Sequence, residues 1–255
     1  MKAGAFVAVI IMGNLLRRAG FFKEEDFYVL SKIVLKITLP AAIISNFSGI
    51  DLKPSMLVMT LLGFGGGILY ITMAFFMSIG KEREERAFNV LNLPGYNIGN
   101  FTMPFAQSFL GPVGVVATSL FDTGNAFVCL GGAYSVAVVT KEKNARFSLL
   151  PVVKTLLKSL PFDAYLIMTV LSFLHVALPA PITSFTGVIG NANAFMAMLM
   201  IGVGFKLNGD SSQPGKIVRI LAARYSLAII LALVFYFLLP FGIEYRQALT
   251  ILALS

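Results

Sequence analysis

Asp122 is the one acidic side chain that lies well inside an apolar segment of this 255-residue chain. Thr118, Asp122, Asn125 and Cys129 follow one another at spacings of 4, 3 and 4 residues, which places them on one face of a helix. An ionisable side chain inside a membrane costs about 2.5–3.5 kcal/mol on insertion scales and marks a functional position by default. We therefore predict that Asp122 binds a coupling ion, H⁺ or Na⁺. A structural carboxylate, bonded to a neighbouring interrupted helix, is the alternative.

A second group of polar residues lies between Asn89 and Gly114, in the sequence NVLNLPGYNIGNFTMPFAQSFLGPVG. Its prolines cannot donate to the carbonyls four residues earlier, so this apolar segment cannot be a regular helix. Freed backbone groups are tolerated at membrane depth only where they are buried in protein or line a wet cavity. Such an interrupted segment is the best sequence pointer to a transporter's substrate site. The predicted helix breaks are at Pro94, Gly95 and Gly99, and at Pro40 in an earlier apolar segment.

Amides and hydroxyls beside this interruption are candidates for binding an anion. Asparagine supplies N–H donors without burying a charge, and a half-helix restarting near Phe101 would direct its positive dipole end at the anion. A kink whose polar groups are satisfied by neighbouring helices is the alternative. The predicted substrate-binding residues are Asn97, Asn100, Thr102, Pro104, Asn125 and Asn191, the last with helix packing as its alternative role.

The composition excludes an ordinary soluble domain. The chain is 57% hydrophobic and 13% charged, whereas soluble domains are about half apolar and about a quarter charged. Its apolar residues form blocks of about 20, the length that crosses a bilayer as a helix. One cysteine, Cys129, cannot form an internal disulfide or a metal cluster. We find no G-x-S-x-G, no H-E-x-x-H and no nucleotide-binding loop, so we predict neither an enzyme nor a cofactor or metal site.

The blocks predict an all-α polytopic membrane protein with eight spans and the beginning of a ninth. Basic residues are concentrated on one side of them: 17 of the 20 Lys and Arg follow odd-numbered spans. The positive-inside rule then puts those loops in the cytoplasm and the N-terminus outside, and the net charge of +8 does not indicate nucleic-acid binding. The predicted spans are Ala3 to Leu16, Tyr28 to Ser48, Pro54 to Ile79, Asn89 to Gly114, Val113 to Thr140, Phe162 to Leu178, Ile182 to Leu207, Ile217 to Leu239 and a ninth from about Tyr245.

This alternation also predicts three regions. Residues 1–140 would hold a first five-span repeat, residues 141–161 a cytoplasmic connector, and residues 162–255 an incomplete second repeat. Because the first five-span half begins outside the membrane and the second half begins inside, the two halves would have opposite orientation, as in inverted-repeat transporters.

Three blocks of sequence resemble the auxin efflux carrier family, which includes malate and malonate permeases. They are GNLLRRAGFFKEEDFYVLSKIVLKITLPAAIISNFSGIDL at Gly13 to Leu52, GYNIGNFTMPFAQSFLGPVGV at Gly95 to Val115, and GVGFKL at Gly202 to Leu207. The resemblance implies a ten-span fold of two inverted five-span repeats, with broken fourth and ninth helices that cross at the centre. It implies small organic anions as substrates and is compatible with a homodimer.

Against that pattern, the first span is short and the ninth and tenth spans are essentially missing, giving about eight and a half. A fragment of a longer protein is the simplest explanation, and a short carrier completed by a partner chain is the alternative. The function we expect is secondary active transport of a small carboxylate, such as malate, malonate or an auxin-like acid, in the bacterial inner membrane. A non-transporting sensor or receptor, or a channel, is the alternative.

Overall fold

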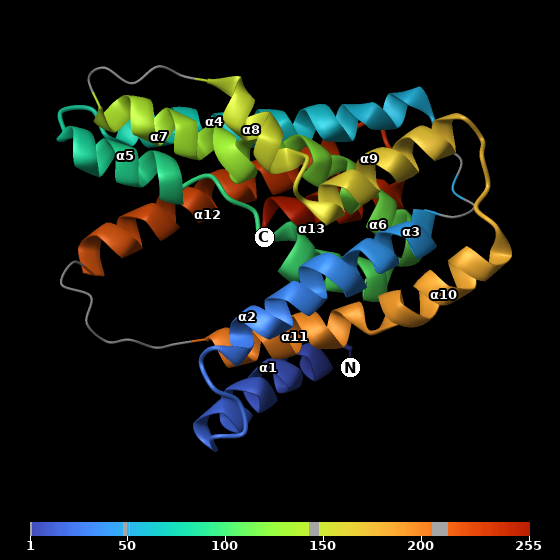
Figure 1. Cartoon of the computed structure of the whole chain (residues 1–255). Coiled ribbons are helices and arrows are strands. Elements are labelled where there is room, and N and C mark those ends of the chain that lie inside the picture. Colours follow the sequence, from blue (N-terminus) through green and yellow to red (C-terminus); the bar gives the residue numbers. More distant parts are fainter. Residues whose placement is uncertain (1, 48–49, 51, 143–147, 206–213) are drawn as a thin grey trace.

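The computed structural model describes residues 2–47, 50, 52–142, 148–205 and 214–255, and these ranges contain helices and no strands. Part of the predicted connector and the end of GVGFKL lie outside the described residues. Figure 1 shows the helices packed into one bundle. They are α1 (Lys2–Arg18), α2 (Asp26–Ile33), η1 (Val34–Thr38), α3 (Leu39–Phe47), η2 (Pro54–Leu57), α4 (Val58–Met77), α5 (Arg83–Asn92), η3 (Ile98–Thr102), α6 (Met103–Phe127), η4 (Val128–Gly132), α7 (Ala133–Lys141), α8 (Leu149–Leu156), α9 (Leu160–Phe173), α10 (Ala180–Asn191), α11 (Asn193–Gly204), α12 (Pro214–Phe237) and α13 (Ile243–Ala253).

Five helical runs of the described chain are long and apolar enough to cross a membrane, as expected for a multi-pass membrane protein. A sixth is added if α8 and α9, which meet at an angle of 80°, count as one bent span. The five runs are Asp26–Phe47, Pro54–Met77, Ile98–Lys141, Ala180–Gly204 and Gly215–Phe237.

The predicted second, third, seventh and eighth spans coincide with four of these runs. The predicted first span is α1, whose 17 residues fall short of the roughly 20 that cross a bilayer. The predicted fourth and fifth spans share the 44-residue run Ile98–Lys141. Eight and a half crossings and an inverted repeat therefore stay predictions, while the all-helical fold is confirmed for the described residues, with five helices that could span a membrane.

A sharp bend at Gly111 divides the long run within α6. Its φ of 61° and ψ of −149° lie outside the helical region, in a conformation that glycine adopts without steric cost. Pro112 follows directly and cannot donate a helical hydrogen bond. The bend lies where the predicted fourth span ends and the fifth begins.

Glycines allow α4 and α6 to approach closely. A Cβ added at Gly63 would lie 2.0 Å from the carbonyl oxygen of Phe121, and one added at Gly124 would lie 1.8 Å from that of Thr60. Gly67 faces Val128 in the same way, at 2.6 Å. Gly63 and Gly67, spaced four residues apart, therefore serve close helix packing within one chain.

Two main apolar cores and one small cluster, made of Ala126, Val152, Leu156 and Phe162, hold the described helices together. The larger joins α3, α4, α6, α9, α12 and α13, and a row of edge-to-face aromatic rings runs through it from Tyr70 to Tyr96 to Phe121 to Phe235. The smaller joins α2 and α11 around Val34 and Met198, with residues of α1 packed against it. Large apolar side chains also cover much of the outer surface, as expected where lipid replaces water as the solvent.

Candidate functional site

The predicted interruption lies between the end of α5 at Asn92 and the start of η3 at Ile98. Pro94 is buried, and Gly95 has a φ of 151°. Asn97 is exposed and makes no side-chain bond to the start of the next helix. The helix restarts at Ile98, three residues before the predicted position near Phe101. The N-terminal end of this helix is thus left without a side-chain cap.

The restart is a π-helical turn, and a matching turn occurs in the predicted second span. η3 ends at Thr102 and is followed by Met103 and Pro104, while η1 ends at Thr38 and is followed by Leu39 and Pro40. In each case the residue before the proline donates its N–H to the carbonyl five residues earlier. A π-helical turn accommodates the following proline, because a bond to the carbonyl five residues earlier takes the place of the usual bond to the carbonyl four residues earlier. Pro40 therefore widens a helix that continues from Asp26 to Phe47.

Buried polar groups gather where η3 packs against η1 and α11. The Thr38 hydroxyl donates to Oδ1 of Asn193 over 2.9 Å, and both side chains are buried. Nδ2 of Asn193, Oγ1 of Thr102 and Oδ1 of Asn100 are buried without a hydrogen-bond partner in the described part of the chain. Leaving a buried polar group unpaired costs about 1–3 kcal/mol. Such a group of atoms is therefore suited to a bound ligand or water.

Arg224 of α12 extends to the interruption. Its Nη2 donates to the carbonyl of Gly95 and, over 2.9 Å, to the backbone carbonyl of Ser255. The Tyr70 hydroxyl donates to the backbone carbonyl of Arg224 over 3.3 Å. Arg224 is one of the 17 basic residues that follow odd-numbered predicted spans and so was expected on the cytoplasmic side, whereas its guanidinium lies beside the broken helix. An arginine within the apolar run Gly215–Phe237 was the signal that could have identified it.

Asp122 forms a separate polar group between α6 and α9. Its Oδ1 accepts from Nδ2 of Asn125 over 3.0 Å, and its Oδ2 accepts from the Tyr165 hydroxyl over 3.0 Å. The Cys129 thiol donates to Oδ1 of Asn125 over 3.0 Å. The predicted polar face is thus a bonded chain from Asp122 to Cys129, while the buried Thr118 hydroxyl has no partner among the described residues. Tyr165 was missed because it lies 43 residues away on another helix.

The predicted site residues therefore fall into two groups. Thr102 and Pro104 are buried and Asn100 is half-buried at the interruption, where a Cβ added at Gly99 would lie 2.9 Å from Cδ2 of Leu39. Asn125, predicted to bind substrate, is bonded to Asp122 instead. Asn191 is exposed at the end of α10, and the neighbouring Asn193 is the buried amide. No cluster of three His, Cys, Asp or Glu side chains suited to a metal occurs in the described part of the chain.

The bonds described for Asp122 do not run to the broken helix, as the alternative role of a structural carboxylate would require. They run to Asn125 in the same helix and to Tyr165 of α9, so the carboxylate links two helices of the bundle. The cation beside the interruption is Arg224. The acid, Asp122, and the base, Arg224, thus lie in two different parts of the bundle.

No family model, characterised protein or solved structure matches the chain. The resemblance to the auxin efflux carrier family therefore stays a prediction from sequence motifs.

Proposed function

We propose that the protein is a secondary active transporter that moves a small organic anion across a membrane by alternating access. The observation that carries this proposal is the guanidinium of Arg224 beside the interruption between α5 and η3. A buried or half-buried cation in an apolar bundle is costly and marks a substrate or ion path in membrane proteins. The substrates that fit are small carboxylates, such as malate, malonate or an auxin-like acid.

The chemistry of the interruption favours a carboxylate. A guanidinium has five N–H donors in a planar fork that matches a carboxylate, and the bonds described for Arg224 use Nη2 alone. The uncapped start of η3 adds the positive end of a helix dipole. The Thr102 hydroxyl and Nδ2 of Asn193 are buried and donate to no acceptor among the described residues. In this proposal they donate to the carboxylate oxygens of the substrate that Arg224 leaves free.

Alternating access requires two groups of helices that rotate against each other. The two apolar cores support such a division, because the smaller is built from α2 and α11 and the larger from α4, α6, α12 and α13. The bond between Tyr165 of α9 and Asp122 of α6 lies within the larger group, beside the helices that would rotate. We propose Asp122 as the site of the coupling ion, H⁺ or Na⁺.

The proposed orientation, with the N-terminus outside a cell membrane, is supported by the basic helix ends. Lys141 lies 3.6 Å from Glu84 in an ion pair, Arg219 donates to the carbonyl of Met77, and Arg17 donates to that of Val203 over 2.9 Å. Each contact joins helix ends that the positive-inside rule assigns to the same side. These ends all lie towards the left side of the bundle in Figure 1. An inverted repeat of residues 1–140 and 162–255 is consistent with this arrangement.

Counterflow in proteoliposomes tests the function. Vesicles containing the purified protein and loaded with unlabelled malonate should transiently accumulate labelled malonate from outside, with saturation, and vesicles without protein should not. Flux that does not saturate and shows no counterflow would indicate a channel. Binding of malonate, malate or an auxin-like acid without flux would indicate a receptor. Either result would overturn the transporter proposal.

A further inference from the structure

A groove of about 390 Å³ lies at the C-terminal end of α4 and is not part of either polar group described above. Its walls are mostly apolar and contain one basic side chain. The lining residues are Thr72, Phe75, Phe76, Ile79, Gly80 and Arg86. Since α4 belongs to the candidate span Pro54–Met77, the groove lies where a membrane-crossing helix ends.

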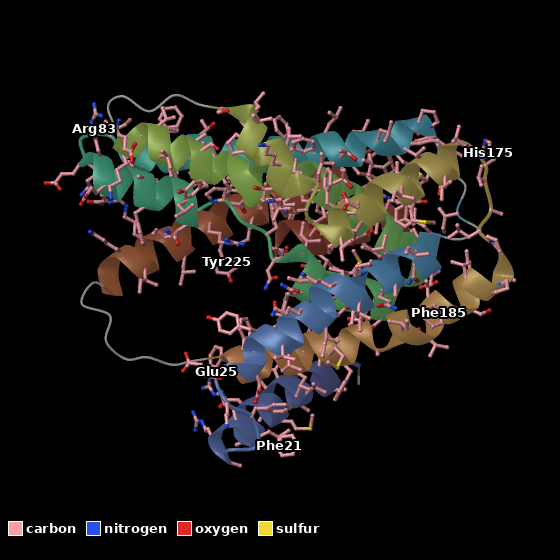
Figure 2. All side chains as sticks on the ribbon, in the orientation of Figure 1. Phe21, Glu25, Arg83, His175, Phe185 and Tyr225 are labelled. Carbon is pink, nitrogen blue, oxygen red and sulfur yellow. The ribbon has the colours of Figure 1, made fainter. Side chains whose placement is uncertain are left out.

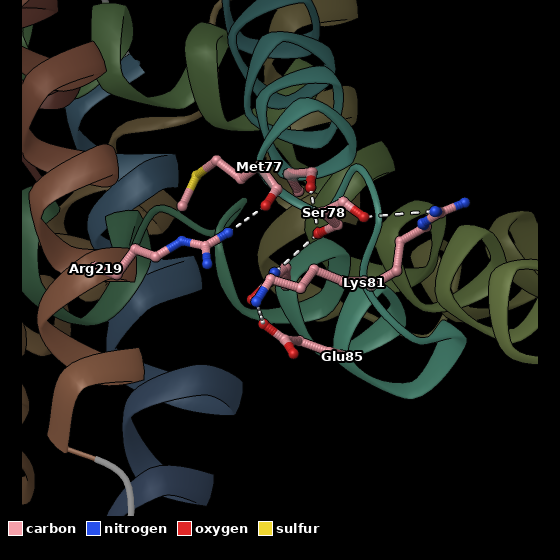
Figure 3. A network of polar contacts seen from close by, with 8 residues as sticks. Met77, Ser78, Lys81, Glu85 and Arg219 are labelled. Atoms are coloured by element: carbon pink, nitrogen blue, oxygen red, sulfur yellow. Dashed lines mark hydrogen bonds and ion pairs between the residues drawn. The ribbon is translucent and has the colours of Figure 1, made fainter.

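The turn after α4 brings Arg86 over this groove. Gly80, with a φ of 75°, permits the reversal between α4 and α5. The buried Ser78 fixes the turn, because its hydroxyl donates to the Ala74 carbonyl over 2.6 Å and accepts from Nδ2 of Asn89 over 2.8 Å. Figure 3 shows Ser78 at the centre of this network, with Arg219 bonded to Met77 beside it. The groove is therefore formed by a well-bonded turn.

Arg86 is a cation without an acidic partner in the described part of the chain. Its one described bond, from Nη2 to the Ser78 carbonyl, is long at 3.4 Å, and its Nε is buried without a partner. Two of the three acids in the same turn are paired elsewhere: Glu85 with Lys81 at 3.7 Å and Glu84 with Lys141 at 3.6 Å. Figure 3 shows the first of these pairs. The third acid, Glu82, does not line the groove. The groove thus carries a net positive charge beside an apolar wall.

We propose that this groove binds a phospholipid with an anionic headgroup. The phosphate would accept from the guanidinium of Arg86, since arginine matches phosphate oxygens bidentately. One acyl chain would lie along Phe76 and Ile79, whose side chains are 69% and 72% exposed. A free phosphate would leave this apolar wall uncovered, and a zwitterionic lipid would bring a second cation towards Arg86. The combination of one charge and an apolar wall at a membrane boundary fits a lipid.

Lipid-dependent thermal stability of the purified protein in detergent tests this site. Phosphatidylglycerol should raise the melting temperature at lower concentration than phosphatidylcholine does. In Arg86→Gln the apparent affinity for phosphatidylglycerol should fall roughly fivefold, the effect of one basic residue on an anionic lipid. Arg83→Gln is the matched control, because Arg83 is an exposed arginine of the same helix that does not line the groove and lies at the outer edge of the bundle in Figure 2.

A second variant separates lipid binding from folding. Phe76→Ser changes an exposed side chain, so the fold should be kept while the apparent affinity for phosphatidylglycerol falls. Glycerol 3-phosphate, which carries the headgroup phosphate without acyl chains, should not stabilise the protein. Equal phosphatidylglycerol affinity in Arg86→Gln, Phe76→Ser and the unchanged protein would overturn the proposal. So would stabilisation by glycerol 3-phosphate as strong as that by the lipid, or crosslinking that shows a second copy covering Phe76.

Discussion

The Tyr165 hydroxyl donates a hydrogen bond to Oδ2 of Asp122 over 3.0 Å and so connects α9 to α6 across 43 residues of sequence. Nδ2 of Asn125 donates to the other carboxylate oxygen, Oδ1. Both oxygens of the carboxylate are therefore held by donors from two different helices. Because the bond from Tyr165 depends on the carboxylate, a change in the charge of Asp122 would alter the contact between α6 and α9.

Asp122→Asn should separate exchange from accumulation. The amide keeps the size of the side chain but cannot exchange a proton or balance a cation. Malonate counterflow should persist, whereas accumulation driven by a pH or Na⁺ gradient should be lost. Uptake into proteoliposomes with and without each gradient measures this. Asp163→Asn, an acid at the start of α9, is the control and should keep full coupling; unchanged coupling in Asp122→Asn would remove Asp122 from the mechanism.

Tyr165→Phe should lower stability by about 1.5–3 kcal/mol, the range for a hydrogen bond to a charged group. The ring still fills the core, where Tyr165 is 1% exposed, so the loss would come from the hydroxyl alone. Chemical unfolding in a mild detergent measures the change. Tyr134→Phe, at a position 64% exposed on α7, should have little effect. A stability equal to that of the unchanged protein would contradict the bond described here.

Arg224→Lys should weaken transport nearly as much as Arg224→Gln. A lysine keeps the positive charge but cannot form the planar, two-pronged contact with a carboxylate. We expect the KM for malonate to rise roughly tenfold or more in both variants, since a charge-assisted bond is worth about 1.5–3 kcal/mol. Lys216→Gln, an exposed cation on the same helix, should leave KM unchanged. A normal KM in Arg224→Gln would show that the anion binds elsewhere.

Thr102→Val and Thr38→Val should act differently although the two threonines occupy matching π-helical turns. Thr38→Val breaks the bond to Asn193 and should destabilise the protein by about 1–3 kcal/mol, because a buried acceptor loses its donor. Thr102→Val removes a hydroxyl that has no partner among the described residues, so stability should be kept or raised. If Thr102 contacts substrate, its valine variant should still raise KM. Unfolding and uptake measured on the same preparations distinguish these outcomes.

Gly124→Ala should be among the most damaging small substitutions in the chain. The added methyl group would lie 1.8 Å from the Thr60 carbonyl oxygen, so α4 and α6 must move apart, at a cost of about 1–3 kcal/mol. Thermal unfolding in detergent measures the loss. Gly65→Ala is the control, since a Cβ there meets no atom within 4 Å and alanine favours the helix. A melting temperature unchanged in Gly124→Ala would contradict the close packing of α4 on α6.

Several features were predictable because they depend on local sequence. Apolar blocks long enough to cross a bilayer indicated helices, and the helices found coincide with most of the predicted ranges. The prolines and glycines from Pro94 to Pro104 indicated an interrupted segment, which the structure contains between Asn92 and Ile98. The spacing of Asp122, Asn125 and Cys129 indicated one polar helix face, and those side chains are bonded to one another.

Tertiary structure alone decided which side chains meet. From sequence, Arg224 was one of the basic residues that set the orientation, and only the packing of α12 against the broken segment brought its guanidinium to Gly95. Tyr165 could not be paired with Asp122, nor Thr38 with Asn193, since contacts between helices depend on their rotation and crossing rather than on spacing within either one. Hydrophobic periodicity determines where helices form, whereas the close approach permitted by small residues determines which polar groups they bury together.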